Sequence, residues 1–174
     1  NVGLIAAYHA LQAGIKVVGE AANGLDAEGR NWTYLPYGPF AGLAAYRAWV
    51  EQVCGGEDPL FFAIAESATG RATGVASYLR IAPDSGSIEV GHINYSPLLQ
   101  HTRTATEAMY LMMEQAFELG YRRYEWKCNA LNERSRRAAL RFGFIFEGIV
   151  EQHMIVKGFN RDSAWFRMLD KDWI

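Results

Sequence analysis

The sequence predicts an α+β fold in which a mixed, mostly antiparallel central sheet is flanked by helices on both faces. Two observations support this prediction. Three segments with strand character follow one another closely before residue 96, which is typical of antiparallel pairing. Helical and strand-like segments then alternate along the rest of the chain. Because 174 residues with 50% apolar content can bury a substantial core, we expect one domain over residues 1–174.

The first part of the chain is expected to hold two helices separated by loops. Apolar residues at helical spacing predict an amphipathic helix over residues 2–18, which is too polar and too short to span a membrane. Residues 20–29 show no period and predict a loop. Residues 31–40, rich in aromatic residues and broken by prolines, predict an ordered loop. Residues 41–53 predict a helix. Because the chain begins with Asn, we expect that a first strand of the sheet can lie upstream.

The remaining elements follow from strand alternation and helical spacing. The expected strands span residues 60–66, 72–81, 87–95, 124–128, 144–156 and 164–169. A helix is expected from near Thr104 to Gly120, and a second, strongly basic one over residues 132–142. The first of these helices has an apolar stripe that we expect in the core, formed by Ala105, Ala108, Met109, Met112, Met113 and Ala116.

The loop between residues 95 and 104 gives the first functional signal. A strand that passes through a short polar loop into a helix leaves backbone N–H groups unpaired, and the helix dipole favours anions there. Arg103 adds a positive charge, so the sequence predicts a site for a phosphate-bearing cofactor. The structural alternative is an ordinary helix cap, because Thr104 and Glu107 have the spacing of a capping box. In that case the chain is an interaction domain without a cofactor.

The same loop resembles the acetyl-CoA loop of the GNAT acetyltransferases. The segment Pro97-x-x-Gln100-x-x-Arg103-x-Ala105 is similar to the family pattern Gln/Arg-x-x-Gly-x-Gly/Ala, with its usual preceding proline. The extension Ala105–Ala108 is typical of the branch resembling RimJ and RimL, the protein N-terminal acetyltransferases. Three further blocks resemble the family downstream, namely Asn132–Ser135, Gly143-Phe144 and residues 154–162.

The resemblance implies transfer of an acetyl group from acetyl-CoA to a primary amine by direct attack. The acceptor would be a small molecule or a protein N-terminus, and a homodimer is a family-level expectation. The implied cofactor contacts are Ile93, Asn94, Tyr95, Gln100, His101, Thr102, Arg103, Thr104, Ala105, Thr106, Asn132, Ser135 and Arg136.

Two departures from the family pattern leave an alternative open. Arg103 replaces the first glycine of the loop, and Ala139 stands where the family commonly has a tyrosine that acts as general acid. These departures motivate a second hypothesis, a non-catalytic acyl-CoA-binding or sensor domain.

Acetyl transfer to an amine needs a group that accepts the amine's proton. Glu89 is the first candidate, because it lies eleven residues before Gln100, an offset similar to that of the catalytic glutamate in the family's histone-modifying branch. The structural alternative is a solvated glutamate on an exposed strand face. His92 is the rival, since an unperturbed imidazole pKa of about 6.5 suits the task. Strand alternation puts Glu89 and His92 on opposite faces unless a bulge intervenes, and the family carries a bulge on this strand.

Other groups have weaker expected roles. A backbone N–H near Ile93 or Asn94 would stabilise the oxyanion. Ser135 would hydrogen-bond the leaving thiolate, or else only take part in the start of its helix. Cys128 is expected to be a buried strand cysteine rather than a nucleophile. The aromatic loop would form a wall of the acceptor site through Trp32, Tyr34 and Tyr37.

Composition argues against several other classes of protein. The formal net charge of −2 disfavours a nucleic-acid binder that relies on positive charge. Cys54 and Cys128 cannot form a disulfide framework, and a reducing cytoplasm is expected. The four histidines are scattered without metal-ligand spacing, so no metal is expected. We expect neither a nucleic-acid nor a membrane partner.

Overall fold

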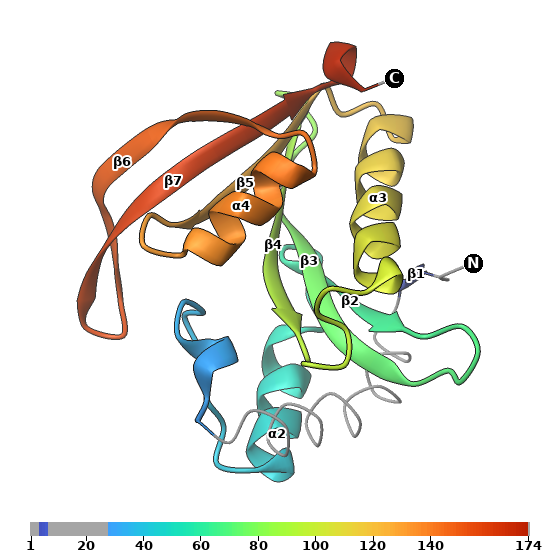
Figure 1. The fold of residues 1–174 in the computed structure, drawn as a ribbon, viewed down its shortest axis with the longest axis vertical. Helices are drawn as coiled ribbons and strands as arrows, with labels where there is room; N and C mark the ends of the chain where they lie inside the picture. The colour runs from blue at the N-terminus through green and yellow to red at the C-terminus, as the bar shows by residue number, and fades with distance from the viewer. Residues whose placement is uncertain (1–3, 7–27, 174) are drawn as a thin grey trace.

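One mixed sheet organises the computed structural model, which describes residues 4–6 and 28–173. The seven strands lie in the order β1-β2-β3-β4-β5-β7-β6, and every neighbouring pair is antiparallel except β4 and β5, which are parallel (Figure 1). The strands are β1 (Leu4–Ala6), β2 (Leu60–Ala65), β3 (Ala72–Ala82), β4 (Ser87–Tyr95), β5 (Arg123–Asn129), β6 (Ile145–Val156) and β7 (Phe159–Leu169). The helices are η1 (Arg30–Trp32), α2 (Leu43–Val53), α3 (Arg103–Glu118), α4 (Glu133–Arg141) and η2 (Asp170–Asp172). None of the described helices is both long enough and apolar enough to cross a bilayer.

Helices cover both faces of this sheet, as the sequence predicts. Strand alternation sends Phe62 and Ile64 of β2 into a core with α3 and α4, while Phe61 and Ala63 face α2 on the other side. The predicted apolar stripe of α3 is buried against the sheet in the first core. The α+β fold with a mostly antiparallel sheet is therefore confirmed.

The start of the chain differs from the prediction. Leu4–Ala6 form a strand paired with β2, with Leu4 opposite Ile64 and Ala6 opposite Phe62, so the helix expected over residues 2–18 is wrong for these three residues. A run of three apolar residues has no period of its own, and the unpaired edge of β2 selects the extended form. The rest of that helix and most of the loop predicted over residues 20–29 lie outside the described residues.

Helix α3 begins earlier than predicted, and Thr102 rather than Thr104 is its N-cap. The backbone of Thr102 is extended (φ −96°, ψ 164°), and its Oγ1 accepts a hydrogen bond of 3.1 Å from the N–H of Ala105. Thr104 is already helical. The predicted capping box of Thr104 and Glu107 is therefore wrong, because the residue three positions after the true N-cap is Ala105.

The later elements agree with the prediction apart from the start of β7. Asn132 caps α4, and its side chain accepts from the N–H of Ser135. Strand β7 begins at Phe159 rather than near residue 164, because Lys157 and Gly158 both adopt positive φ and return the chain directly into pairing with β6. The resulting hairpin is long and curved and forms one end of the sheet (Figure 1).

Candidate active site

Strands β4 and β5 separate partway along their length. Their parallel pairing covers only Ser87–Val90 against Arg123–Trp126. Beyond these residues β4 still pairs with β3 as far as Tyr95, and β5 with β7 as far as Asn129. The facing edges of the two strands thus have no partner strand among the described residues. We call this opening the splay; its free backbone groups can bind an extended polar ligand.

A bulge in β4 lies at the start of the splay. Val75 of β3 is opposite Asn94, whereas Ser77 is opposite Gly91, so β4 contains one extra residue between these pairs. His92, at φ +50°, occupies this bulge. The bulge that the resemblance implies is therefore present.

The bulge places Glu89 and His92 on the same face of the sheet. The ring of His92 lies 5.5 Å from that of Tyr37 and 5.1 Å from that of Phe61, both on the side of α2. Glu89 alternates with Ile88 and Val90, which face the opposite core, so its side chain also lies on the α2 side. Two candidate proton acceptors thus flank one opening, as the sequence predicts for a bulged strand.

Glu89 is buried and ion-paired. It is 3% exposed, and its Oε2 accepts hydrogen bonds of 2.8 Å from Arg80 Nη1 and from Lys127 Nζ. The alternative of a solvated strand glutamate is therefore wrong. Its Oε1 has no partner among the described side chains and lies toward Gly91, where an added Cβ would stand 3.8 Å away. One oxygen of the carboxylate is thus anchored and the other is available.

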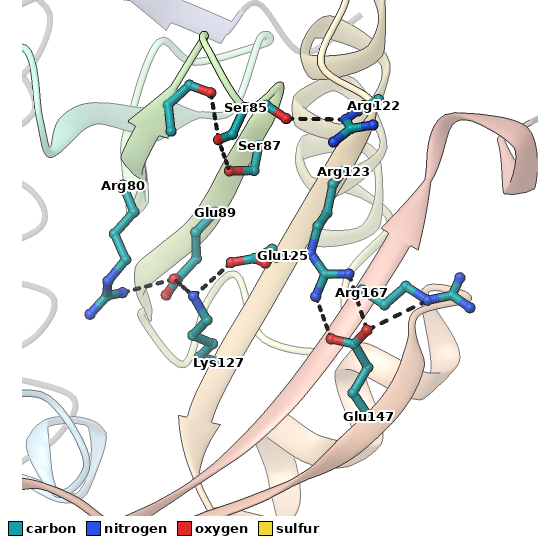
Figure 2. Close-up of polar contacts among 11 residues, drawn as sticks. Arg80, Ser85, Ser87, Glu89, Arg122, Arg123, Glu125, Lys127, Glu147 and Arg167 are labelled. Atoms are coloured by element: carbon teal, nitrogen blue, oxygen red, sulfur yellow. Dashed lines mark hydrogen bonds and ion pairs between the residues drawn. The ribbon is translucent and has the colours of Figure 1, made fainter.

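A row of ion pairs across the sheet holds Glu89 in place (Figure 2). Lys127 also binds Glu125 at 2.6 Å, and its Nζ lies 4.0 Å from the ring centroid of Trp165. The row continues through Arg123 and Glu147 to Arg167. Such a network restricts Glu89 and Lys127 to one geometry.

His92 is a neutral imidazole at pH 7. Burial lowers its pKa to about 4, and the positive charges of Arg80 and Arg161 add to this effect. The expectation of an unperturbed pKa is therefore wrong. His92 Nδ1 lies 3.2 Å from Tyr37 Oη, and burial raises the pKa of Tyr37, so the phenol keeps its proton.

The predicted residues of α4 are engaged within the protein. Ser135 Oγ accepts a hydrogen bond of 2.9 Å from Trp126 Nε1, and Arg136 donates to the carbonyl of Ala130. Burial raises the pKa of Cys128, although a hydrogen bond from Ser135 opposes the rise. Cys128 is thus the buried thiol that was expected. Ala139 is fully buried in the core.

The start of α3 forms an open depression of about 540 Å³. It is lined by His101, Thr102, Arg103, Thr106, Glu107 and Tyr110. Four of these are predicted cofactor contacts. Glu107 and Tyr110 were not predicted to line this site. Their helical spacing from Arg103, which places them on the same side of α3, could have indicated them.

Several backbone groups at this depression are available for a ligand. Among the described residues, the N–H groups of His101, Arg103 and Thr104 have no hydrogen-bond acceptor. Arg141 reaches the same place from α4 and donates to Thr106 Oγ1 at 3.3 Å. Gln100 differs, because its amide donates to the carbonyl of Tyr95 and to Asn31 while its backbone N–H donates to Ser96.

Three successive residues at the end of β4 carry buried polar atoms without partners among the described residues. These atoms are Asn94 Nδ2, Tyr95 Oη and Ser96 Oγ. Buried polar groups in native proteins are nearly always hydrogen-bonded, so an unpaired group needs an explanation.

The aromatic loop joins distant parts of the chain beside the splay. Tyr34 Oη donates to the carbonyl of Leu131 at 3.2 Å, and Lys157 Nζ donates to the carbonyl of Trp32 at 2.8 Å. The Trp32 side chain is 2% exposed and packs in the core, whereas Tyr37 contacts His92. Tyr37 is therefore the predicted acceptor-site residue that the structure brings nearest to the candidate proton acceptors.

Comparison with known proteins identifies the family. A family model described as an acetyltransferase (GNAT) domain matches residues 22–145. The chain is similar to the structure of a GCN5-related N-acetyltransferase from Brucella melitensis, with 46% identity, a TM-score of 0.89, and coverage of 94% of this chain and 74% of that one. It is also similar to a probable GNAT-family acetyltransferase from Chromobacterium violaceum ATCC 12472, with 42% identity, a TM-score of 0.83, and coverage of 91% and 81%.

More distant structures share the fold. The ribosomal-protein-S5-alanine acetyltransferase from Vibrio fischeri has 16% identity and a TM-score of 0.71, with coverage of 99% of this chain and 94% of that one. A search of proteins with curated functions gave no match. With most of its length covered by the family model and by two relatives above 40% identity, the chain belongs to the GNAT acetyltransferases, in the RimJ/RimL-like branch, and is an acetyl-CoA-dependent N-acetyltransferase.

Proposed function

We propose that acetyl-CoA binds along the splay and that the amine acceptor approaches from the face that carries Glu89 and His92. The observation that supports this most directly is the separation of β4 and β5 beyond Val90, which leaves two strand edges unpaired beside a bulge. Acetyl-CoA supplies an activated thioester carbonyl. The protein supplies the geometry and the proton acceptor.

The residues at the end of β4 and the start of α3 are suited to hold acetyl-CoA. The available N–H groups of His101, Arg103 and Thr104 offer hydrogen bonds and the positive helix end to a pyrophosphate. The unpartnered Asn94 Nδ2 and Ser96 Oγ are polar groups that a bound amide or phosphate can satisfy. We retain the other predicted acetyl-CoA contacts in these two segments as part of the proposed site, namely Ile93, Tyr95, Thr102, Ala105 and Thr106.

The residues of α4 and Gln100 have a supporting role in this proposal. Asn132, Ser135 and Arg136 hydrogen-bond within the protein and fix the junction of β5 and α4. Gln100 fixes the loop before α3. Arg141 replaces Arg136 as the cation of α4 nearest the depression.

Glu89 is the proposed proton acceptor, acting through Oε1 either directly or through one water. An α-amine with a pKa of about 8 must lose a proton before it attacks.

The backbone N–H of Ile93 or Asn94, exposed by the bulge, would stabilise the carbonyl oxygen. Because Ala139 provides no phenol, the sulfur would leave as a thiolate, which a thiol of pKa about 8.5 tolerates without an acid.

Family membership favours catalysis over the non-catalytic acyl-CoA-binding domain. Cys54 and Cys128 are both free and buried, which supports the proposed reducing compartment. The homodimer stays a prediction.

The proposed function is tested first by cofactor binding and then by turnover. Acetyl-CoA and CoA at one hundred times their Kd should each stabilise the protein by about 2.7 kcal/mol, whereas ATP at the same concentration should do little. Absence of any shift at millimolar acetyl-CoA would overturn the proposed site.

The role of Glu89 is tested by a matched pair of variants. Glu89→Gln should lower kcat by about 100-fold or more. Glu125→Gln also removes a carboxylate bound to Lys127 and should lower kcat far less. If both variants bind acetyl-CoA and keep wild-type turnover, Glu89 is not the proton acceptor. If Glu89→Gln fails to fold, Gly91→Ala, which adds a methyl group beside Oε1 and Leu79, provides the second measurement through kcat.

A further inference from the structure

Arg161 is a partly buried cation that forms no ion pair with any residue that the structure describes. It lies on β7 opposite Met154 of β6, and its Nε is buried with no acceptor among the residues that the structure describes. Other arginines on this face differ: Arg80 pairs with Glu89, and Arg167 pairs with Asp172. A guanidinium that is buried and unpaired lowers stability, so its presence suggests a missing partner.

The position of Arg161 is at the open end of the splay. It lies just beyond the last paired residues of β5 and β7, Asn129 and Ser163, and alternation puts it on the face of Trp165, on which Lys127 packs. It is near enough to His92 to lower that residue's pKa, and burial lowers its own pKa while Cys128 and Glu89 oppose the change. Arg161 therefore faces the region proposed for the acceptor.

The charges around this region favour an anionic group. Arg80, Lys127 and Arg161 are positive, whereas Glu89 is already shared by two of them and Glu125 is shared with Arg123. His92 is neutral at pH 7. A second ammonium on the acceptor would be repelled here, and a carboxylate would be attracted.

We propose that Arg161 binds a carboxylate carried by the amine acceptor, which is then an amino acid or a peptide whose N-terminal residue is Asp or Glu. The planar guanidinium can bind a carboxylate through two parallel hydrogen bonds, which fixes the orientation of the nearby amine. This proposal rests on the proposed function and specifies its substrate class.

The experiment compares acceptors that differ only in a carboxylate. One arm uses amino acids against their amides, and a second uses peptides that begin with Asp or Glu against peptides that begin with Asn or Gln. In at least one arm, the wild-type enzyme should prefer the carboxylate by about 10- to 100-fold in kcat/KM. The arm that shows the preference identifies the source. A linear diamine should be a poor substrate.

Variants of Arg161 assign the preference to this residue. Arg161→Gln should reduce the ratio to near one and leave the Kd of acetyl-CoA unchanged, whereas Arg161→Lys should keep part of the preference. Arg167→Gln, on the same strand and face, should keep all of it. Arg161→Gln should also be no less stable than wild type, because it removes a partly buried charge that has no ion-pair partner among the described residues.

Three results would overturn the inference. They are equal use of acceptors with and without a carboxylate in both arms, an unchanged ratio in Arg161→Gln, and weaker acetyl-CoA binding in Arg161→Gln. Failure of the proposed function would be distinct, since the wild-type protein would then not bind acetyl-CoA at all.

Discussion

Glu89 and His92 show how burial has opposite consequences for two neighbouring ionisable residues. Glu89 is buried beside Arg80 and Lys127, so its charge is compensated where it lies. His92 is buried beside aromatic rings and within reach of two arginines, so its charged form would be desolvated and repelled. The site therefore presents an ion-paired carboxylate and a neutral imidazole on one face.

The low pKa of His92 predicts a specific loss of stability in acid. The pKa of about 4 in the folded state is below the ordinary value of 6.5, so the unfolded chain binds more protons between these values. Ionisation of His92 leaves the free energy of unfolding unchanged above about pH 6.5. As the pH falls toward 4, that free energy decreases by at most on the order of 3 kcal/mol. Urea unfolding of wild type and His92→Gln at pH 7, 5.5 and 4.5 measures it. We expect the free energy of unfolding of the wild type to fall more steeply. Parallel pH curves for the two proteins would contradict the prediction.

At the scale of elements, the start of α3 determines how the proposed phosphate site is built. Thr102→Ala removes the cap and should lower the free energy of unfolding by about 1 kcal/mol. Thr104→Ala is the matched control, since Thr104 lies inside the first turn and should change stability by a few tenths of that. Chemical denaturation of both variants measures the difference. Equal effects, or a larger effect for Thr104→Ala, would mean that the helix begins later than the structure has it.

Elements with a strong local pattern could be predicted from the sequence. The stripe of α3 and the alternation in β5 are set by burial of one face, and they specify both the element and its orientation. The cap of α3 was predicted wrongly at Thr104, because Thr104 and Glu107 have the spacing of a capping box, whereas the turn before Thr102 decides where the helix begins. Strand β1 was missed because a three-residue edge strand is defined by its partner and not by its own sequence.

The candidate site was harder to predict than the fold, because register determines it. The family resemblance indicated the loop before α3 and the bulge in β4. No local pattern shows that Arg80 and Lys127 meet Glu89, since these contacts depend on the pairing of three strands. The role proposed for Arg161 gives no local signal in the sequence, because it depends on the lack of an ion pair with any of the described residues.

At the scale of the whole molecule, the aromatic loop connects parts of the chain that fold as separate elements. It is held to the end of β4 by Asn31, to the start of α4 by Tyr34, and to the β6–β7 hairpin by Lys157. These hydrogen bonds surround the splay on the acceptor side. The loop therefore contacts both the hairpin, which carries Arg161, and His92 through Tyr37.

Loss of the contact between Lys157 and the loop should loosen the acceptor side and leave the cofactor side unchanged. Lys157→Met keeps most of the side-chain volume and removes the hydrogen bond to the carbonyl of Trp32. A bond of this kind contributes about 0.5–1.5 kcal/mol, so amide exchange in residues 30–40 should become about two- to tenfold faster. The KM for the amine should rise, while the Kd of acetyl-CoA stays constant. Lys171→Met, at an exposed position in η2, is the control and should change neither. Unchanged exchange in residues 30–40, or equal weakening of amine and acetyl-CoA binding, would show that the hairpin and the loop are not coupled through Lys157.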